Sequence, residues 1–225
     1  MLSEIDLHKL AGKFIVVDGG DGCGKSTIVS RLEADLRGAN VPVLQVREPG
    51  GTEYGEKIRD LLLHWKPESG ERLLPIAEAL LFSAARAQLF HTTIRPAIVQ
   101  GVCVITDRFV SSTFAYQGSA GVPARSIAVI TDTIIPLGEQ PYLTVVVDVP
   151  HAEAVERMKA SGSEPDRIES QGDIFHKNVR RAFRQMRFIM PNNYYVEVVD
   201  GSGTVDEVFG RVCKAISDNL VNRDV

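Results

Sequence analysis

The residues Gly19, Gly24, Lys25 and Ser26 have the types and the spacing needed to bind a polyphosphate. They form the pattern Gly-x-x-x-x-Gly-Lys-Ser, which follows four apolar residues at 14–17 and opens a segment with helical periodicity. Glycine backbones can adopt positive φ and turn successive N–H groups toward phosphate oxygens. The helix start adds free N–H groups, the lysine reaches the outer phosphates and the serine can ligate Mg²⁺. This stretch predicts a nucleotide site, although the pattern alone does not define the reaction.

We expect the whole loop to contact the nucleotide, and its members are Gly19, Gly20, Asp21, Gly22, Cys23, Gly24, Lys25, Ser26 and Thr27. The alternative, a glycine-rich turn that matches by chance, is disfavoured because strand, spacing, lysine, serine and helix occur together. A helix N-terminus would lower the pKa of the Cys23 thiol, but we interpret Cys23 as a small tolerated residue.

Arg47 stands at the end of a second predicted strand, residues 41–47, and is followed by Glu-Pro-Gly-Gly. The proline restricts the backbone and the glycines permit a sharp bend, so the arginine is expected at the strand end, where open α/β sheets bind ligands. The alternative is a surface arginine before an ordinary turn. Residues 55–63 then predict a short helix.

Phe82 and Arg86 lie four residues apart in a long helical pattern over residues 71–99, with bends or ends expected near Pro75 and Pro96. Residues at this spacing share a helix face, so an aromatic ring and a planar guanidinium could hold a base between them. Without further evidence, the pattern alone favours Phe82 as an ordinary core residue.

Asp107 ends a third strand, residues 102–107, which is apolar on both faces as expected of a central parallel strand. A carboxylate at this position can bind Mg²⁺ or its water shell, and Arg108 beside it faces the same crevice. We expect residues 109–118 to form a polar loop that brings Ser112, Tyr116 and Gln117 to the site.

Asp148 ends a fourth strand and competes for the metal role, but we prefer Asp107 because of its arginine neighbour; Asp148 should order the turn before a helix at His151. Residues 157–170 are basic and broken by glycine and proline, which suits a lid over phosphates, with a solvated loop as the alternative.

Strands that alternate with helices predict an α/β fold, a P-loop NTPase three-layer sandwich with a five-stranded parallel sheet and a short lid. Residues 171–190 and 204–220 complete it as helices, with a fifth strand at 194–199. With no linker, residues 1–225 predict a single domain.

The formal charge of −4, without a basic run, argues against a nucleic-acid partner. No stretch approaches the ~18–20 apolar residues of a membrane span, and residues 1–10 do not resemble a signal peptide, so we expect no membrane association and a cytoplasmic location. The three cysteines, at 23, 103 and 213, are too far apart in sequence to suggest a zinc site.

Together these motifs resemble the bacterial thymidylate kinase family from about residue 13 to the C-terminus. The matching motifs are residues 19–27, Arg47-Glu-Pro-Gly-Gly-Thr52, Leu81-Phe82-x-x-Ala-Arg86, Asp107-Arg108-Phe109, Ala115-Tyr-Gln-Gly118 and Asp166-Arg-Ile-Glu169. The resemblance implies phosphorylation of dTMP to dTDP with ATP and Mg²⁺, and a homodimer in contact through its long central helices. Alternatives are another nucleoside or nucleotide kinase and a P-loop ATPase switch.

The resemblance also implies residue roles. Lys25 and Ser26 would hold the ATP phosphates and Mg²⁺, and Asp107 would serve the metal. Arg47 and Arg108 would clamp the dTMP phosphate. The nucleoside would be bound by Phe82 stacked on thymine, Arg86 at the base edge, Asp21 on the 3′-hydroxyl, and Ser112, Tyr116 and Gln117 around it.

Gly22 follows Asp21 where some family members carry an arginine, so the charge on the transferring phosphoryl group must be met from the lid. Arg157 is our choice for that role beside Lys25, Asp107 and Arg108. Three departures from the family pattern, Phe109, Ser161 and Phe183, leave contacts in the lid and pocket open.

Overall fold

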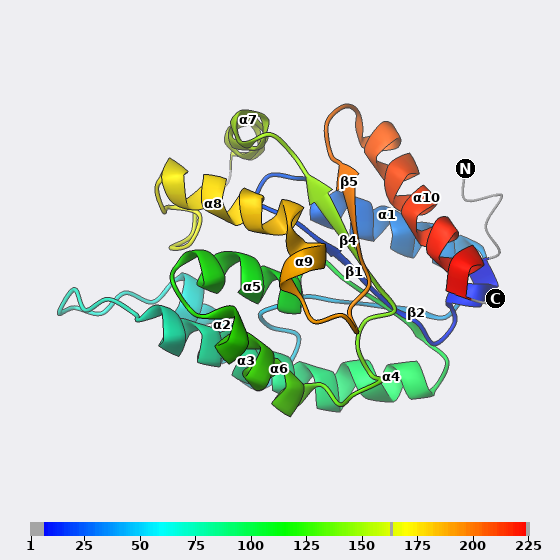
Figure 1. The fold of residues 1–225 in the computed structure, drawn as a ribbon, viewed down its shortest axis with the longest axis horizontal. Helices are drawn as coiled ribbons and strands as arrows, with labels where there is room; N and C mark the ends of the chain where they lie inside the picture. Colours follow the sequence, from blue (N-terminus) through cyan, green and yellow to red (C-terminus); the bar gives the residue numbers. More distant parts are fainter. Residues whose placement is uncertain (1–6, 163, 224–225) are drawn as a thin grey trace.

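Five parallel strands form one sheet in the computed structural model of the chain, which describes residues 7–162 and 164–223 (Figure 1). The strands are β1 (Phe14–Asp18), β2 (Val43–Val46), β3 (Cys103–Thr106), β4 (Leu143–Asp148) and β5 (Val196–Asp200), in the spatial order β2-β3-β1-β4-β5. Strand β1 is central and pairs with β3 and β4. From β1 the chain crosses to β2 on one side, and from β3 it crosses to β4 on the other. A ligand crevice therefore lies beyond the carboxyl ends of β1 and β3.

Helices cover both faces of the sheet, which confirms the predicted three layers. They are α1 (Lys25–Gly38), α2 (Glu53–Leu63), α3 (Pro75–Leu89), α4 (Arg95–Val99), α5 (Val110–Ser119), α6 (Ala124–Ile134), α7 (His151–Ser161), α8 (Asp173–Arg184), α9 (Met186–Ile189) and α10 (Val205–Arg223). One apolar core joins α1 and α10 to one face of the sheet, and a second joins α3, α5, α6, α8 and α9 to the other (Figure 1).

Alternate residues of β1 supply the two cores, with Phe14 and Val16 on one side and Ile15 and Val17 on the other. All five residues of β1 are buried, because a central parallel strand is covered on both faces. The rigid strand therefore delivers the loop after Asp18 to a defined place.

The expected loop at residues 109–118 is wrong, because Val110–Ser119 is helix α5. Its apolar residues, including Phe114 and Ala115, are buried between α3, α6 and α8, while Ser111 and Ser112 bond a buried carboxylate. A helix covered on most of its surface needs no amphipathic stripe, which hides it from a periodicity argument.

The long helical pattern also differs in detail. Helix α3 begins at Pro75 rather than at residue 71, since proline suits the first helical turn, and a π-helical segment, η3 (Phe90–Ile94), leads into α4 before Pro96. Helix α6 lies in a stretch, residues 119–142, for which we predict no element from the sequence.

The lid is shorter than predicted. Helix α7 continues to Ser161 and ends at Gly162, whose φ of 69° is left-handed, so Arg157 and Lys159 project from a helix rather than from a loop. Residues 164–170 form the return arm of the lid, which leads from Gly162 toward α8. Asp166 stabilises a turn in this arm, because its Oδ1 accepts hydrogen bonds from the backbone N–H groups of Ile168 (2.7 Å) and Glu169 (2.9 Å). The side chain of Ser161 lies outside the described residues.

Candidate active site

Two glycines let the phosphate loop pack closely against neighbouring elements. Gly19 has φ 144° and Gly22 has φ 74°, conformations that side-chain-bearing residues rarely adopt. A Cβ at Gly19 would lie 2.5 Å from the Val147 carbonyl oxygen, and one at Gly22 would lie 2.3 Å from that of Ala154. The loop is therefore held between the end of β4 and helix α7.

Lys25 is buried and bends back over the loop that precedes it. Its Nζ donates to the Gly20 carbonyl at 2.7 Å and lies 3.7 Å from the Cys23 sulfur. An ammonium group has three N–H donors, so others can meet a phosphate. Burial raises the pKa of the Cys23 thiol despite Lys25 nearby, so the expected lowering by the helix N-terminus is outweighed.

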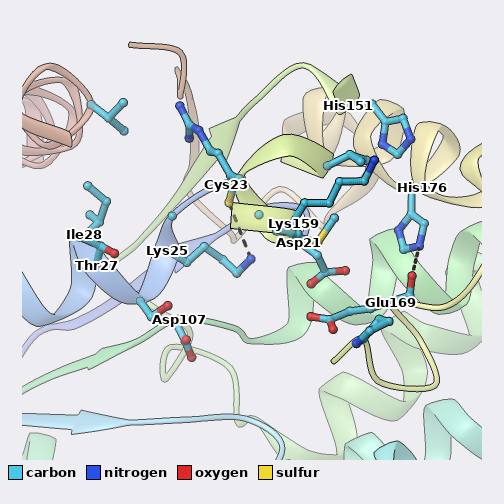
Figure 2. A pocket seen from close by; sticks show the side chains of 18 of the residues that line it. Asp21, Cys23, Lys25, Thr27, Ile28, Asp107, His151, Lys159, Glu169 and His176 are labelled. Atoms are coloured by element: carbon cyan, nitrogen blue, oxygen red, sulfur yellow. Dashed lines mark hydrogen bonds between the residues drawn. The ribbon is translucent and has the colours of Figure 1, made fainter. Parts of the chain in front are cut away.

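A cleft of about 1080 Å³ opens in front of the phosphate loop (Figure 2). Lys25 and Asp107 lie on one side of it, and Lys159, His151, His176 and Glu169 lie on the other. The remaining lining includes Ser26 and Thr27, Arg157 on α7, and residues 203–205 at the start of α10. The cleft thus joins the predicted phosphate, metal and lid residues.

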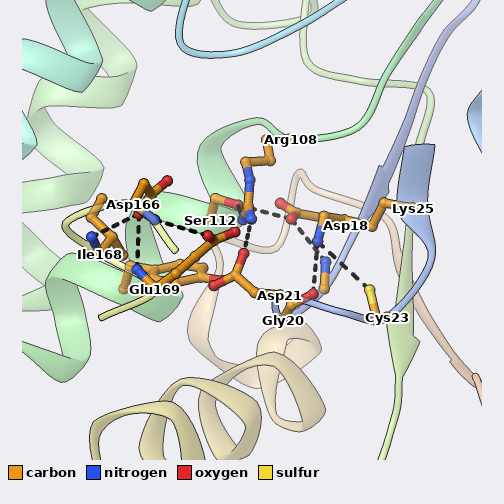
Figure 3. A network of polar contacts seen from close by, with 12 residues as sticks. Asp18, Gly20, Asp21, Cys23, Lys25, Arg108, Ser112, Asp166, Ile168 and Glu169 are labelled. Carbon is orange, nitrogen blue, oxygen red and sulfur yellow. Dashed lines mark hydrogen bonds and ion pairs between the residues drawn. The ribbon is translucent and has the colours of Figure 1, made fainter. Parts of the chain in front are cut away.

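Asp21 is the centre of a polar network that joins the loop to β3 and α5 (Figure 3). Arg108 donates to Asp21 Oδ1, and the Tyr116 hydroxyl donates to Oδ2 at 2.7 Å. Burial alone would raise the pKa of Asp21, but Arg108, Lys25 and the Tyr116 hydrogen bond outweigh it and lower the pKa below its ordinary value. Asp21 is therefore a carboxylate at neutral pH.

Asp18, the last residue of β1, stabilises this network through hydrogen bonds and is not among the site residues predicted from the sequence. Its carboxylate accepts from the Gly19 backbone N–H and from Ser112, both at 2.8 Å, and also from Ser111. Arg108 Nη1 donates to the same Ser112 hydroxyl at 3.2 Å. An acid that ends an apolar strand directly before a glycine is the sequence signal that could have indicated this role.

A second cavity of about 150 Å³ adjoins the cleft and contains most of the predicted substrate residues. Asp21, Phe82, Arg86, Arg108, Ser112, Tyr116 and Gln117 all line it. Asp21, Arg59, Arg108 and Glu169 line both cavities. The structure therefore places the second cavity next to the phosphate loop, with Arg59 and Arg108 lining both this cavity and the cleft.

Arg86 is buried at the edge of the second cavity, and each of its nitrogens makes a hydrogen bond. Nε donates to Glu48 at 2.8 Å, Nη1 to the Thr113 hydroxyl at 3.0 Å and Nη2 to the Phe109 carbonyl at 3.0 Å. A guanidinium has five N–H groups, so donors remain for a ligand. Burial raises the pKa of Glu48 to about 7 in spite of Arg86.

Arg47 is not among the residues that line either cavity. Strand β2 is at the edge of the sheet, and the Arg47 side chain is 56 % exposed and paired with Glu56 at 2.8 Å. Arg59, on α2, is half-buried, donates to the Pro49 carbonyl at 3.0 Å and lines both cavities. The arginine that faces the crevice from this part of the chain is therefore Arg59. Sequence reasoning missed it because it lies in α2, after the Arg47-Glu-Pro-Gly-Gly-Thr52 motif rather than within it.

Three other predicted residues have specific partners. Arg157 lines the cleft, but its Nη2 donates to Glu153 (2.5 Å) and to the Gly201 carbonyl (3.0 Å), which ties α7 to the turn before α10. Arg167 pairs with Glu78 on α3. We expected Asp148 to order the turn before α7, but its side chain makes no capping hydrogen bond there. It accepts two hydrogen bonds from Arg180 on α8, at 2.7 and 3.0 Å.

The departures from the family pattern at 109 and 183 fall in the core. Phe109 packs edge-on against Phe14 with ring centroids 4.9 Å apart, and Phe183 packs against Tyr116 at 6.0 Å. Both are 1 % exposed, so they support the pocket rather than line the second cavity.

The residues present fit Mg²⁺ bound to a nucleotide better than a metal held by protein alone. Among residues 7–162 and 164–223, no three His, Cys, Asp or Glu side chains gather into a metal cluster. The half-buried Asp107 and the exposed Ser26 both line the cleft, and a hydroxyl and a carboxylate leave most positions of an octahedral ion to phosphates and water.

Every helix in the described part of the chain is too short or too polar to cross a membrane.

Comparison with known proteins identifies many relatives of similar length. A protein named thymidylate kinase from Caldanaerobacter subterraneus subsp. tengcongensis is 37 % identical over 212 residues, which is 94 % of this chain and 98 % of the relative. Proteins of the same name from Bradyrhizobium diazoefficiens (38 %; 93 % and 91 % covered) and Deinococcus radiodurans (36 %; 92 % and 97 %) are also similar. The thymidylate kinase family model matches residues 17–210, and the chain belongs to the thymidylate kinase family.

Proposed function

We propose that this protein transfers the γ-phosphoryl group of ATP to dTMP, with Mg²⁺, and so forms dTDP. The observation that supports this best is the pair of adjoining cavities, one at the phosphate loop and one lined by Phe82 and Arg86, which share Arg59 and Arg108. A donor and an acceptor nucleotide could then meet where two arginines offset the repulsion between their phosphates.

In this proposal the phosphate loop, Lys25, Ser26 and Thr27 bind the donor phosphates. Lys25 is a point charge that can follow the transferring group, and the backbone N–H groups of residues 19–24 hold the phosphates in place. Bound Mg²⁺ would neutralise phosphate charge, with Ser26 as a ligand and Asp107 on the metal or on its waters.

The acceptor nucleotide would place its base against Phe82, with Arg86 donating at the base edge. Asp21 is held ionised by Arg108 and Tyr116, so it can accept a hydrogen bond from the sugar hydroxyl. Arg59 and Arg108 would bind the acceptor phosphate. The protein needs no general base, because the second pKa of a phosphate monoester is about 6 and the attacking oxygen is already an anion at neutral pH.

Arg157 and Lys159 would meet the charge that develops in the transition state as α7 and the lid approach the donor. Both residues line the cleft. Neither residue lines the second cavity, which we call the acceptor pocket because it is the proposed site of dTMP. Their contribution should therefore fall on turnover rather than on dTMP binding.

We also propose a homodimer formed by α2, α3 and α6. Helix α3 packs against both α2 and α6. The three helices, together with Leu74 directly before α3, expose apolar side chains at 39–65 % of their surface, namely Leu61, Leu74, Ile76, Leu80 and Val129. A large exposed apolar face is typical of an interface. The cytoplasmic location expected from the sequence stays a prediction.

The test is a coupled ADP-release assay with dTMP, dUMP, dCMP and thymidine as acceptors, followed by calorimetric titration of dTMP into the protein without ATP. We expect the highest kcat/KM with dTMP and saturable binding of dTMP alone. Activity on thymidine but not on dTMP would favour a nucleoside kinase. Hydrolysis of ATP without any dTMP binding would favour an ATPase switch.

A further inference from the structure

A buried carboxylate behind the acceptor pocket determines which atom of a pocket amide faces the ligand. Glu78, on α3, is 6 % exposed and lines neither cavity, whereas Gln117, on α5, is 2 % exposed and lines the acceptor pocket. The Gln117 Nε2 donates to Glu78 Oε1 at 2.8 Å. An ionised carboxylate only accepts hydrogen bonds, so the NH₂ group of the amide must point toward Glu78.

The carbonyl oxygen of Gln117 is left as the end of the amide that can meet a nucleotide. Among the described residues, none donates a hydrogen bond to this oxygen. The oxygen is also absent from the buried side-chain atoms that lack a partner, so it is accessible from the pocket. Flipping the amide would place its carbonyl against the carboxylate of Glu78 and lose the hydrogen bond in a buried site, which is costly. The Gln117 carbonyl oxygen is therefore a hydrogen-bond acceptor that faces the pocket.

Arg86 supplies the opposite polarity in the same pocket, because a guanidinium has donors only. A donor beside an acceptor matches the edge of thymine, which carries the O4 acceptor next to the N3–H donor. Cytosine has the reverse pattern, with its amino group at C4 and an acceptor at N3. Such a site rejects the wrong base because buried polar groups would be left unpaired.

We infer that Glu78 is a positioning residue for base specificity, which acts through Gln117 and selects a base with an N–H donor at position 3. This inference rests on the proposed binding of dTMP in the second cavity. The other oxygen of Glu78 accepts from Arg167, whose Nε also donates to the Leu62 carbonyl at 2.7 Å. Arg167 in this way holds the carboxylate in place from the return arm of the lid.

The direct test is Glu78→Gln in the full chain, because a neutral amide can accept from Gln117 or donate to it, so Gln117 would no longer be held in one orientation. The ligands are dTMP, dCMP and the 3-deaza analogue of dTMP. The base of this analogue is a 4-hydroxy-2-pyridone, in which C–H replaces N3–H and the C4 oxygen is a hydroxyl that can still accept a hydrogen bond from Arg86. We expect the parent to bind the analogue about tenfold more weakly than dTMP, which is the effect of one good hydrogen bond.

In Glu78→Gln, affinity for dTMP should fall roughly three- to tenfold, while the penalty for the deaza change should shrink to about twofold. The ratio of kcat/KM between dTMP and dCMP should narrow with it. Glu139→Gln is the matched control, since Glu139 is half-buried and paired with Arg95 but lines neither cavity, and it should leave all three affinities unchanged.

Glu78→Gln also strands the charge of Arg167, so the same measurements on Glu78→Gln/Arg167→Gln test the inference if the single variant does not fold. Equal weakening of dTMP and its deaza analogue in these variants would make Glu78 merely structural and overturn the inference. Failure of the parent to bind dTMP at all would instead refute the proposed function.

Discussion

Arg86 and Glu48 form an ion pair in which both side chains are only 3 % exposed, with Nε and Oε2 2.8 Å apart. The second oxygen of Glu48, Oε1, is buried without a hydrogen-bond partner in the described structure. Burial raises the pKa of Glu48 from 4.5 to about 7, and the negative charges of Asp18 and Asp107 act in the same direction, against Arg86. Glu48, which lines the acceptor pocket together with Arg86, therefore titrates near neutral pH.

This pKa predicts a specific pH dependence of stability. Because the folded state holds the Glu48 proton more tightly than the unfolded state, its contribution to the free energy of unfolding is greatest below pH 4.5 and is lost as the pH rises through about 7. Glu48→Gln removes this titration. We expect the stability of the variant relative to the parent to improve by about 1–3 kcal/mol between pH 5 and pH 8. Urea unfolding at both pH values measures it, and a pH-independent difference would contradict the prediction.

Arg59 and Arg47 make a matched pair for the acceptor phosphate. Arg59 lines both cavities and Arg47 is exposed at the sheet edge, so Arg59→Ala should lower kcat/KM for dTMP about 100-fold or more, the effect of a lost charge-assisted contact of about 3 kcal/mol. Arg47→Ala should change it by no more than a few-fold. Steady-state kinetics with varied dTMP decides between them, and the reverse order would restore Arg47 as the clamp.

Phe82 is half-buried and lines the acceptor pocket, where it can stack on the base. Phe82→Ala should raise the KM for dTMP by the equivalent of about 1–3 kcal/mol and leave the KM for ATP nearly unchanged. Equal losses for the two substrates would show that the ring serves only the core.

Arg157 and Lys159 should act on turnover. An arginine at the transition state can be worth about 10³–10⁵ in rate, and we expect Arg157→Ala to lose toward the lower end of that range or less, because Lys159 lies nearby. Arg157→Ala, Lys159→Ala and the double variant are compared for kcat and for dTMP affinity by calorimetry. A kcat within a few-fold of the parent in all three variants would contradict this prediction and leave Arg157 with its contact to the Gly201 carbonyl.

Leu80, 51 % exposed on α3, tests the proposed dimer. Leu80→Glu should convert the protein to a monomer in sedimentation velocity, since a charge in an apolar interface has no partner. Val221→Glu, which alters a side chain 64 % exposed on α10, is the control and should not change the mass. A monomeric parent would refute the interface.

Contiguous parts of the chain could be predicted from the sequence. The strand, loop and helix from Phe14 to Gly38 follow local rules, in which an apolar run, glycines and a helix start lie next to one another. Phe82 and Arg86 share a face for the same reason, because a single helix sets their spacing. These stretches contain the donor loop and part of the acceptor pocket.

Relations between distant segments were decided only by the tertiary structure. Strand β2 is at the edge of the sheet because of its pairing with β3, and this pairing turns Arg47 outward and leaves Arg59 to face the crevice. Glu48 meets Arg86 across 38 residues and Glu78 meets Gln117 across 39. Which buried charge finds which partner depends on how whole helices pack, and no local periodicity encodes it.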